Sequence, residues 1–382
     1  MAARKRILCV HQGGELYGSD RSFLQAVQAM RTGWPDAQIK VVLAADGPLR
    51  VPLQEVSDLV KVRDLCVLRL ANPVSTGLKS SIAAPYYLAR ATADIAHADL
   101  TYINTTVIAD YMLAARSASS KTVIHAREIP KLKALPIIRG LVRASGSHVI
   151  FNSQATKHSF SLNPTQKTEV IHNGVDAIAG AIPVEPPKVF SVSRPLRVAM
   201  LGRVSDWKGQ DLLIEAVAQL PRELRDIVSV RIVGSTFRDA RGPIDKLEEQ
   251  IRAAGLSKII LLEPFLDDPA EVYRWADLCV VPSKLPEPFG RVAIEAMAYG
   301  RPAIVAAHGG LVEIVEDGES GWHFEPNNSP MLAVALEEAL TRPRELARRA
   351  AAALLRFENN FSANMMTQKL TSTLKNWIPN LR

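Results

Sequence analysis

The sequence predicts an α/β protein made of two doubly wound, Rossmann-like domains. Short runs rich in Val, Ile and Leu alternate with amphipathic segments such as 209–220, in which apolar residues recur with a period of about 3.6. Such an alternation is typical of parallel sheets with helices on both faces. The length of 382 residues and the hydrophobic share of 47% suit two cores better than one.

The predicted strands are short runs in both halves of the chain, bounded by polar residues, glycine or proline. In the first half they are 6-RILCVH-11, 39-IKVVLA-44, 99-DLTYIN-104, 122-TVIHA-126, 148-HVIFN-152 and 169-EVIHN-173. In the second half they are 196-LRVAML-201, 228-VSVRIV-233, 258-KIILL-262, 278-LCVVP-282 and 303-AIVAA-307.

The boundary between the halves is predicted at 174–195, which contains four prolines and shows neither strand nor helix periodicity. We therefore expect an N-terminal domain over 1–180 and a C-terminal domain over 194–360. The helical stretch 361–378 follows, and we expect residues 361–382 to cross back to the N-terminal domain. Because ligands of such sheets bind beyond the carboxyl ends of the strands, the main site is expected in the cleft between the domains.

Composition and charge narrow the class of protein. The three cysteines are far apart and odd in number, which favours a reducing compartment over a disulfide framework. No apolar run approaches the roughly 18 residues that a membrane span needs, and the start MAARKRILCVHQ is typical of a first strand, not of a signal peptide. We expect a cytoplasmic protein.

The positive charge lies in the first half of the sequence. Residues 1–180 contain 21 Lys and Arg against 13 Asp and Glu, whereas the remainder is nearly neutral. A basic half suggests an anionic partner such as a phosphorylated substrate or a lipid surface, although an ordinary solvated surface explains it equally well. Aromatic residues are too sparse among the basic ones to indicate a nucleic-acid binder.

Several common ligand-binding motifs are absent from the sequence. There is no G-x-G-x-x-G for a nicotinamide or flavin cofactor and no G-x4-G-K-[ST] phosphate loop. No D-x-D pair and no His/Cys cluster with metal-ligand spacing occurs. We therefore expect no cofactor and no bound metal.

Two glutamates in the stretch 287-EPFGRVAIEAM-297 are the first candidate site residues. Glu287 lies between two prolines, which favour an extended chain, and Gly290 begins a predicted helix that carries Glu295. The N–H groups and the positive dipole end of that helix point to the loop of Glu287. Two carboxylates beside such donors suit a ligand with many hydroxyls, unless Glu287 merely caps the helix and Glu295 is solvated.

Two cations form a second candidate site in 198-VAMLGRVSDWKGQDLLIEA-216. A predicted strand ends at Leu201, and Arg203 and Lys208 follow in the turn that leads into the next helix. An anion is favoured at such a strand end and helix N-terminus, so the two cations could neutralise a diphosphate. Either residue alone would be read as an ordinary surface cation.

These motifs together resemble glycosyltransferase family 4, whose members are retaining enzymes with the two-domain GT-B fold. The resemblance is strongest from about Arg197 to Pro326 and looser before it. It is carried by LGRV, KGQDLLIEA, VRIVG, ADLCVVPS, EPFGRVAIEAMAYGRPAI and HGGLVEIVEDGESGW, and in the first half by GGELYGSD, VIHAREI, FNSQAT and VIHNGVD.

The resemblance implies a role for each candidate in the second half. Glu295 would bind the ribose hydroxyls of a nucleotide, and Glu287 would bind hydroxyls of the donor sugar. The backbone N–H groups of Phe289, Gly290 and Arg291 would add donors near the sugar and the phosphates. Arg203 and Lys208 would neutralise the leaving diphosphate, which explains why no D-x-D is needed.

In the first half the resemblance singles out a glycine loop and a histidine. Gly13 and Gly14 follow the first strand, where a side chain would obstruct the donor phosphate or the acceptor. His125 ends a strand and would contact the donor sugar. Arg127 and Glu128, which follow it, could contact the acceptor or form an internal ion pair, and the ion pair is favoured. The role of His308 is open.

The resemblance implies a retaining, metal-independent transfer of a sugar from a nucleotide-diphosphate sugar to a glycan or lipid-linked saccharide, in cell-surface polysaccharide or lipopolysaccharide synthesis. A GT-B epimerase and a non-catalytic nucleotide-sugar-binding protein are the alternatives. The acceptor is least defined. The basic amphipathic stretch 131-KLKALPIIRGLVR-143 could lie on the anionic inner face of a membrane, or it could be a solvated helix.

Overall fold

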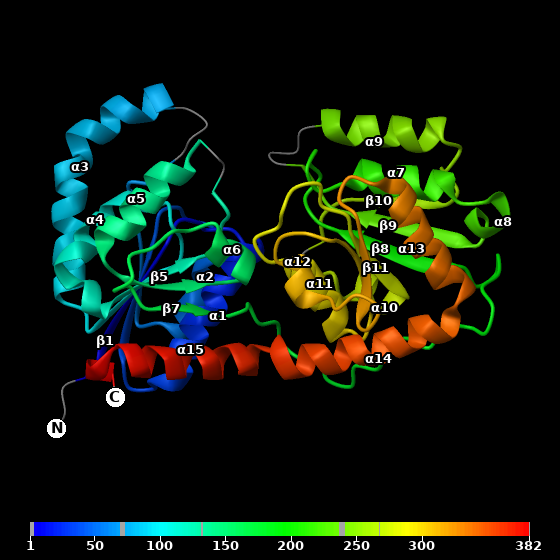
Figure 1. Cartoon of the computed structure of the whole chain (residues 1–382). Coiled ribbons are helices and arrows are strands. Elements are labelled where there is room, and N and C mark those ends of the chain that lie inside the picture. The colour runs from blue at the N-terminus through cyan, green and yellow to red at the C-terminus, as the bar shows by residue number, and fades with distance from the viewer. Residues whose placement is uncertain (1–3, 69–72, 131–132, 237–240, 267, 382) are drawn as a thin grey trace. The chain divides into compact units, whose positions relative to one another are not determined.

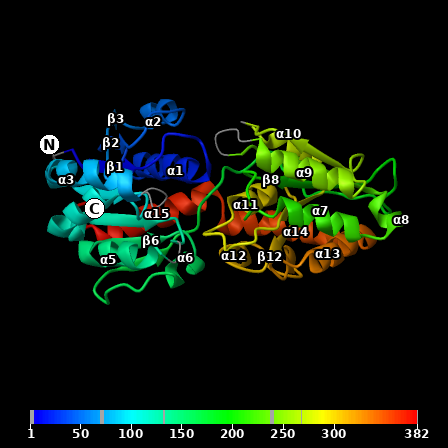
Figure 2. The same cartoon turned by 90° about the horizontal axis from the view of Figure 1, so that it is seen from above.

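The computed structural model describes residues 4–68, 73–130, 133–236, 241–266 and 268–381. The chain forms two compact units, Met1–Gly174 with Ala363–Arg382 and Val175–Ser362. Each is a parallel sheet with helices on both faces (Figures 1 and 2), which confirms the predicted fold class. From Val175 onward the stretch expected as a linker belongs to the second unit, where Val184 and Phe190 are buried.

The first unit contains a sheet in the order β3-β2-β1-β4-β5-β6-β7 among the described residues. Each strand pairs in parallel with its neighbours. The strands are β1 Arg6–His11, β2 Gln38–Leu43, β3 Leu59–Val62, β4 Leu100–Ile103, β5 Thr122–Ala126, β6 His148–Phe151 and β7 Thr168–Val170.

Two apolar clusters, one on each face, form the core of this unit. One contains side chains of α1, α2 and α15, and the other contains side chains of α3, α4 and α5. The helices are α1 Gly18–Gly33, α2 Arg50–Val56, α3 Pro73–Ala96, α4 Ala109–Ala114, α5 Leu135–Ser145, α6 Gln154–His158 and α15 Ala363–Trp377, with 3₁₀ turns η1 Ala115–Lys121 and η3 Pro379–Leu381.

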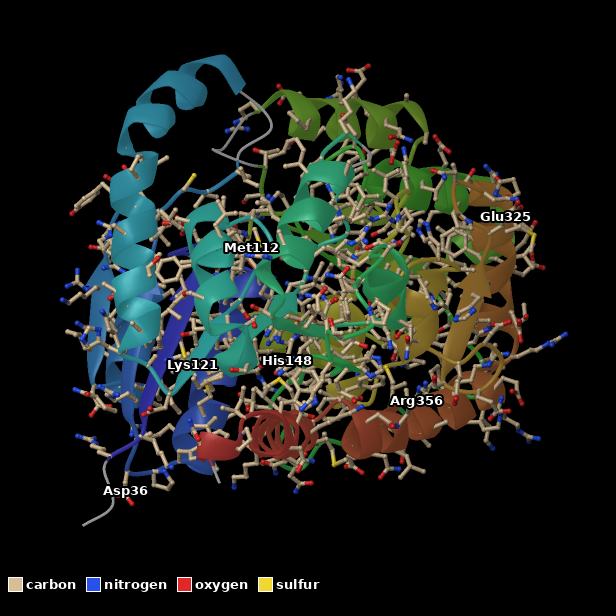
Figure 3. The ribbon with its side chains drawn as sticks, turned by 60° about the vertical axis from the view of Figure 1, so that its left-hand side comes forward. Asp36, Met112, Lys121, His148, Glu325 and Arg356 are labelled. Atoms are coloured by element: carbon tan, nitrogen blue, oxygen red, sulfur yellow. The ribbon has the colours of Figure 1, made fainter. Side chains whose placement is uncertain are left out.

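The last helix, α15, packs against the first unit, although it is the final part of the chain. His148, labelled in Figure 3, meets Trp377 of this helix edge-on with 5.3 Å between the ring centroids. Trp34 donates from its indole Nε1 to the carbonyl of Leu381 over 2.7 Å. Buried side chains of α15 complete the core cluster over α1.

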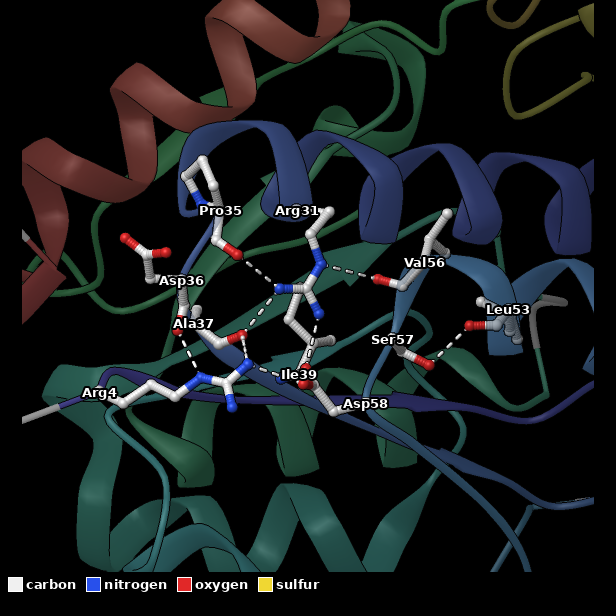
Figure 4. A network of polar contacts seen from close by, with 10 residues as sticks. All are labelled: Arg4, Arg31, Pro35, Asp36, Ala37, Ile39, Leu53, Val56, Ser57 and Asp58. Carbon is white, nitrogen blue, oxygen red and sulfur yellow. Dashed lines mark hydrogen bonds and ion pairs between the residues drawn. The ribbon is translucent and has the colours of Figure 1, made fainter.

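A polar network at the surface joins the end of α1 to the start of β2 (Figure 4). Asp58 accepts hydrogen bonds from Arg31 over 2.6 Å, from Arg4 over 2.8 Å and from the backbone N–H of Ile39 over 2.8 Å. The side chains are partly exposed, so we expect this network to fix the loop between α1 and β2 more than to stabilise the whole unit.

The second unit contains a sheet in the order β10-β9-β8-β11-β12-β13 within the ranges described. Helices α7, α9 and α13 cover one face, and α10, α11, α12 and α14 cover the other. The strands are β8 Leu196–Leu201, β9 Val228–Val233, β10 Ile260–Glu263, β11 Leu278–Val281, β12 Ala303–Ala306 and β13 Gly321–Phe324. The helices are α7 Gln210–Gln219, α8 Arg222–Arg225, α9 Gly242–Ala253, α10 Ala270–Trp275, α11 Arg291–Ala298, α12 Leu311–Ile314, α13 Ser329–Thr341 and α14 Pro343–Asn360.

Two strands, β3 and β13, were not predicted from the sequence. Both lie at the edge of a sheet and have four residues. β3 is mostly exposed and carries Lys61, so the apolar pattern of a buried strand is absent. Edge strands pair on one side only and need less apolar sequence, which explains the omission of β3. β13 is buried at three of its four positions and was missed because Gly321 and His323 interrupt its apolar run.

Each sheet has one point where the order of strands reverses. It lies between β1 and β4 in the first unit and between β8 and β11 in the second. From this point, successive strands are added toward one edge of the sheet on one side and toward the other edge on the other side. The loops that follow the two central strands therefore lead away from each other, and a crevice is left between them at the carboxyl edge. The structure therefore indicates one ligand-binding position in each unit before any side chain is considered.

In the second unit the two loops at this point pack tightly at Gly209. This residue has a φ of 81° and precedes α7, and a Cβ placed on it would lie 2.0 Å from the carbonyl oxygen of Pro282. The backbone carbonyl cannot swing aside as a side chain could. Only glycine allows the loop after β8 to approach the loop after β11 this closely.

We expect Gly209→Ala to lower the free energy of unfolding by more than about 2 kcal/mol, because both the positive φ and the close carbonyl oppose a methyl group. Gly140→Ala is the matched control, since no atom lies within 4 Å of a Cβ built at Gly140 on α5. The control should raise the free energy by about 0.5–1 kcal/mol. Urea denaturation measures both, and equal effects would contradict this account of the loop.

Candidate nucleotide-sugar site

An ion pair joins the two loops at the carboxyl edge of the second sheet. Lys208, in the loop after β8, places its Nζ 2.6 Å from Oε1 of Glu287, in the loop after β11. Ser283 donates from its hydroxyl to the same oxygen over 2.5 Å. The Lys208 side chain is 18% exposed and that of Glu287 9%, so the pair is largely removed from water.

The carboxylate of Glu287 keeps capacity for a further partner. Among the described residues, both of its side-chain hydrogen bonds fall on Oε1, whereas an ionised carboxylate can accept about four. The positive charge of Lys208 already balances the negative charge of Glu287. A neutral donor such as a sugar hydroxyl is therefore the partner that Oε2 can accept without a further cation.

The backbone around Glu287 is fixed by the loop after β12. Gly310 donates its N–H to the carbonyl of Glu287 over 2.8 Å. Gly309 has a φ of 61°, and a Cβ there would lie 2.4 Å from the same carbonyl oxygen. His308 is within 2.7 Å of the carbonyl of Ser283 through its Nε2. His308, whose role the sequence left open, thus braces the loop that carries Glu287.

Glu295 is also held by protein side chains. It lies on α11 and accepts from Nε of Arg291 over 2.8 Å and from the hydroxyl of Tyr273 over 2.9 Å. Burial, and then the neighbouring Glu295, raises the pKa of Tyr273 well above its ordinary value, so the hydroxyl stays a donor. The N-cap of α11 is Gly290 at a φ of 115°, without a side-chain cap. The alternative interpretation of the two glutamates is therefore wrong. Glu287 does not cap α11, and Glu295 is not a solvated side chain.

The remaining predicted residues lie on the same two loops. Arg203 is exposed in the loop after β8, and its carbonyl accepts from Nε2 of Gln210 over 3.0 Å. The Nζ of Lys208 lies 4.3 Å from the centre of the Trp207 ring. Phe289 is buried next to the start of α11 and meets Phe361 edge-on. Backbone at this position can therefore move little.

This arrangement suits an anion and several hydroxyls. It combines two cations, two partly buried carboxylates and the N-terminus of an eight-residue helix at one sheet edge. In the ranges described, no three His, Cys, Asp or Glu side chains gather closely enough to hold a metal ion. Sequence reasoning missed Ser283 and Tyr273, because a hydroxyl gives no signal until the fold shows which carboxylate it faces.

In the first unit the glycine loop is explained by packing within the unit. A Cβ on Gly13 would lie 2.1 Å from Oδ1 of Asp20, and one on Gly14 would lie 2.6 Å from the carbonyl of Ala45. The close backbone carbonyl makes glycine necessary for the fold at Gly14, whereas a side chain at Gly13 would displace Asp20 from its place beside His11. Contact of Gly13 and Gly14 with a donor phosphate or an acceptor stays a prediction.

His125 is 1% exposed at the end of β5 and belongs to a buried polar cluster. Its Nδ1 lies 2.5 Å from the hydroxyl of Tyr102 and 3.2 Å from a guanidinium nitrogen of Arg127. Burial, and then the charge of Arg127, holds the pKa of His125 well below its ordinary value. The imidazole is neutral at pH 7.

Arg127 does not form the expected ion pair with Glu128. Its Nε donates to Oδ1 of Asn104 over 2.6 Å, and its terminal nitrogens donate to Asn173 and other neutral acceptors. The carboxylate of Glu128 instead accepts from Thr105 over 2.7 Å. Oε2 of Glu128 also accepts from the backbone N–H of Arg127 over 3.3 Å, so this carboxylate is turned to the backbone and to Thr105 and not to the guanidinium. That expectation was wrong.

The basic stretch 131–143 is only partly amphipathic in the structure. Lys131 lies outside the described residues. Helix α5 buries Ile138 and Val142 in the core and exposes Ile137, with Lys133 and Arg143 also exposed. No helix in the described ranges is long and apolar enough to cross a membrane.

Comparison with protein families identifies one domain in the second unit. Residues 182–354 match the family described as "Glycosyl transferases group 1". The matched range contains both glutamates and both cations of the site. This result confirms the resemblance inferred from the sequence motifs.

Similar proteins of known name agree with this assignment. A lipopolysaccharide 1,2-N-acetylglucosaminetransferase of Salmonella typhimurium is 31% identical over 46% of this chain and 47% of its own length. A D-inositol 3-phosphate glycosyltransferase of Geodermatophilus obscurus is 38% identical over 38% of this chain and 33% of its own length. The chain thus spans less than half of the curated relatives that it matches.

Similar solved structures cover both units. The structure of Anabaena HepE in complex with UDP and glucose superposes with a TM-score of 0.79 and 26% identity, covering 98% of this chain and 100% of that chain. WaaG, described as a glycosyltransferase involved in lipopolysaccharide biosynthesis, superposes with a TM-score of 0.68 at 15% identity and shows the fold alone. The fold is that of the GT-B glycosyltransferases.

The buried neutral His125 predicts a pH dependence of stability. Below pH 6.5 the unfolded chain binds a proton at this residue that the folded protein does not bind, so the free energy of unfolding falls as the pH is lowered, by up to about 1.4 kcal/mol per unit. His125→Gln should show a shallower decline between pH 6.5 and 5, measured by urea denaturation. The exposed His97→Gln is the control, and identical slopes for wild type and His125→Gln would contradict the burial of a neutral imidazole.

Proposed function

We propose, because the chain carries a glycosyl transferases group 1 domain at residues 182–354, that it transfers a sugar from a nucleotide-diphosphate sugar to a glycan or lipid-linked saccharide. The observation that carries this proposal is the Lys208–Glu287 ion pair between the loops after β8 and β11, where the strand order reverses. A structure similar over nearly the whole chain was solved with UDP and glucose. UDP-glucose is therefore the first donor to test.

Each side chain has a proposed role in binding the donor. Glu295 binds the ribose hydroxyls, and its rigid support by Arg291 and Tyr273 favours a fixed ligand orientation. Glu287 binds hydroxyls of the sugar through Oε2. The backbone at Phe289 and Gly290 and the N-terminus of α11 favour the negative charge of the phosphates.

The proposed chemistry is a retaining transfer. The bond between the anomeric carbon and the phosphate oxygen breaks, and the acceptor hydroxyl forms the new bond on the same face and gives its proton to the leaving phosphate. Arg203 and Lys208 stabilise the charge that develops on the diphosphate. These two cations are the reason to propose that the transfer is independent of a metal ion.

The first unit is proposed to bind the acceptor. Its sheet has its own point of strand reversal, between β1 and β4, and the excess positive charge of the sequence lies in residues 1–180. The similar protein of Salmonella typhimurium is named a lipopolysaccharide 1,2-N-acetylglucosaminetransferase. We therefore propose a cytoplasmic enzyme of cell-surface polysaccharide synthesis that works on the inner face of the membrane.

A ligand screen followed by a transfer assay tests the function. UDP, GDP, dTDP and CMP sugars are screened by thermal shift with and without EDTA, and the best donor is then incubated with lipid-linked saccharide acceptors. One nucleoside diphosphate should raise the Tm equally in both conditions. No stabilisation by any of them would contradict the donor site. Binding without transfer to any acceptor would favour a non-catalytic nucleotide-sugar-binding protein.

Removing either cation should impair catalysis, but the two variants should differ in stability. Arg203→Ala is expected to lower kcat on the order of 10²-fold with little change in the free energy of unfolding, because the side chain is exposed. Lys208→Ala should lower kcat similarly and also destabilise, since it leaves the buried carboxylate of Glu287 without its cation. Steady-state kinetics and urea denaturation measure the two effects.

Two further variants separate catalysis from folding. The double change Lys208→Met with Glu287→Gln removes both charges, so stability should recover relative to Lys208→Ala while transfer stays low. Arg222→Ala removes an exposed arginine of α8 outside the site and should leave kcat unchanged. Full activity in both Arg203→Ala and Lys208→Ala would overturn the assignment of these cations.

Membrane association is proposed through the stretch 131–143, of which the structure describes Lys133 and the exposed face of α5. Binding of the purified chain to vesicles of phosphatidylglycerol, but not of phosphatidylcholine, is expected in a flotation assay. Charge reversal by Lys133→Glu with Arg143→Glu should abolish binding, whereas reversal of the exposed Arg222 and Arg252 of the second unit should not. Equal flotation of both reversed variants would contradict a role of this face.

A further inference from the structure

We infer that Arg127 is a positioning residue that, with Tyr102, fixes the imidazole of His125 as the Nε2–H tautomer and so presents this N–H to the ligand. Only the identity of the ligand, the donor sugar, rests on the proposed function. The inference concerns how the protein sets a hydrogen-bond donor, and it is carried by the directions of the hydrogen bonds inside the first unit.

The tautomer follows from what surrounds Nδ1. A guanidinium can only donate, and the terminal nitrogen of Arg127 lies 3.2 Å from Nδ1 of His125. The same nitrogen is 3.3 Å from the hydroxyl oxygen of Tyr102. The hydroxyl proton has two acceptors within reach, Nδ1 of His125 at 2.5 Å and Oδ1 of Asn104 at 3.4 Å, and the much shorter distance favours donation to Nδ1. A hydrogen on Nδ1 would point at the N–H of Arg127 and at the Tyr102 hydroxyl, so donor would face donor. Nδ1 is therefore the acceptor, and the proton of the neutral ring is on Nε2.

The position of Arg127 is itself fixed from several sides. It is buried, and its Nε donates to Oδ1 of Asn104 over 2.6 Å. Its two terminal nitrogens donate to Oδ1 of Asn173 and to the carbonyl of Ser22. Three partners, from the loops after β4 and β7 and from α1, thus hold the guanidinium in place. A lysine could not reach the same set of acceptors, because it lacks the planar fork.

The guanidinium of Arg127 is linked to the carboxylate of Asp20 through Asn104 and His11. Since Oδ1 of Asn104 accepts from Arg127, its Nδ2 faces Nδ1 of His11 over 3.1 Å and donates to it. The Nε2 of His11 then donates to Oδ1 of Asp20 over 2.8 Å. Arg127 therefore sets the direction of the hydrogen bonds both toward Asp20 and toward His125. Because the carboxylate is reached only through this relay, it does not compete for the contact with His125.

The other end of the His125 ring lacks a partner in the part of the chain that the structure describes. Its Nε2 is buried and makes no hydrogen bond there. Buried polar atoms of native proteins are almost always hydrogen-bonded, so an exception indicates an unseen partner. Nε2 belongs to the penultimate residue of β5, near the carboxyl edge of the sheet, where ligands bind to parallel sheets. A fixed N–H at that edge suits an oxygen acceptor of the ligand.

The tautomer can be read directly by NMR, without an activity assay. Long-range ¹H–¹⁵N spectra of the full chain distinguish Nε2–H, Nδ1–H and imidazolium rings, and His125→Gln identifies the signals of this residue. Wild type should show the Nε2–H form alone between pH 6 and 8. A Nδ1–H ring or an imidazolium in wild type at pH 7 would overturn the inference, and this result needs no variant to fold.

A substitution of Arg127 then tests its role. In Arg127→Gln the His125 signals should show a mixture of tautomers and protonation above pH 6, and kcat should fall on the order of 10²-fold with KM for the donor nearly unchanged. Arg139→Gln on α5 is the matched control and should leave the His125 signals as in wild type. Unchanged His125 signals in folded Arg127→Gln would refute the positioning role. If no sugar transfer is found but the tautomer depends on Arg127, the proposed function fails and this inference stands.

Discussion

The ion pair between Lys208 and Glu287 is the interaction on which the site in the second unit depends. It joins loops from two neighbouring strands at the point where the strand order reverses, and Gly209 and the loop after β12 bring its backbone close enough. A buried carboxylate is unfavourable unless it is paired. The pair therefore organises the loops before a ligand arrives and leaves Oε2 of Glu287 for a hydroxyl.

The first unit uses the corresponding position of its sheet in a different way. Within the described ranges, the guanidinium of its buried Arg127 makes no ion pair with a carboxylate and reaches Asp20 through Asn104 and His11. A direct pair fixes two loops, whereas a chain of hydrogen bonds through Asn104 and His11 fixes hydrogen-bond directions over a longer path. The unit thereby holds a neutral histidine in a fixed orientation beside the buried Arg127.

Much of this structure could be predicted from the sequence, and the omissions have physical causes. The buried strands and α11 follow from local apolar patterns, and β1, β5, β8 and β9 have the predicted bounds. The edge strand β3 was missed because one of its faces is solvated. The partners Ser283, Tyr273, Tyr102 and Asn104 were missed because polar pairings across a sheet depend on which strands become neighbours. The expected ion pair of Arg127 failed for the same reason, since sequence adjacency does not give spatial contact at a strand end.

A crystal structure of the protein with a bound nucleotide-diphosphate sugar tests the central claim most directly. The account predicts the diphosphate within hydrogen-bond distance of Arg203 and Lys208, the ribose on Glu295 and a sugar hydroxyl on Oε2 of Glu287, with the Lys208–Glu287 pair retained. A nucleotide bound at any other edge of the second sheet, or one that breaks this pair on binding, would contradict it.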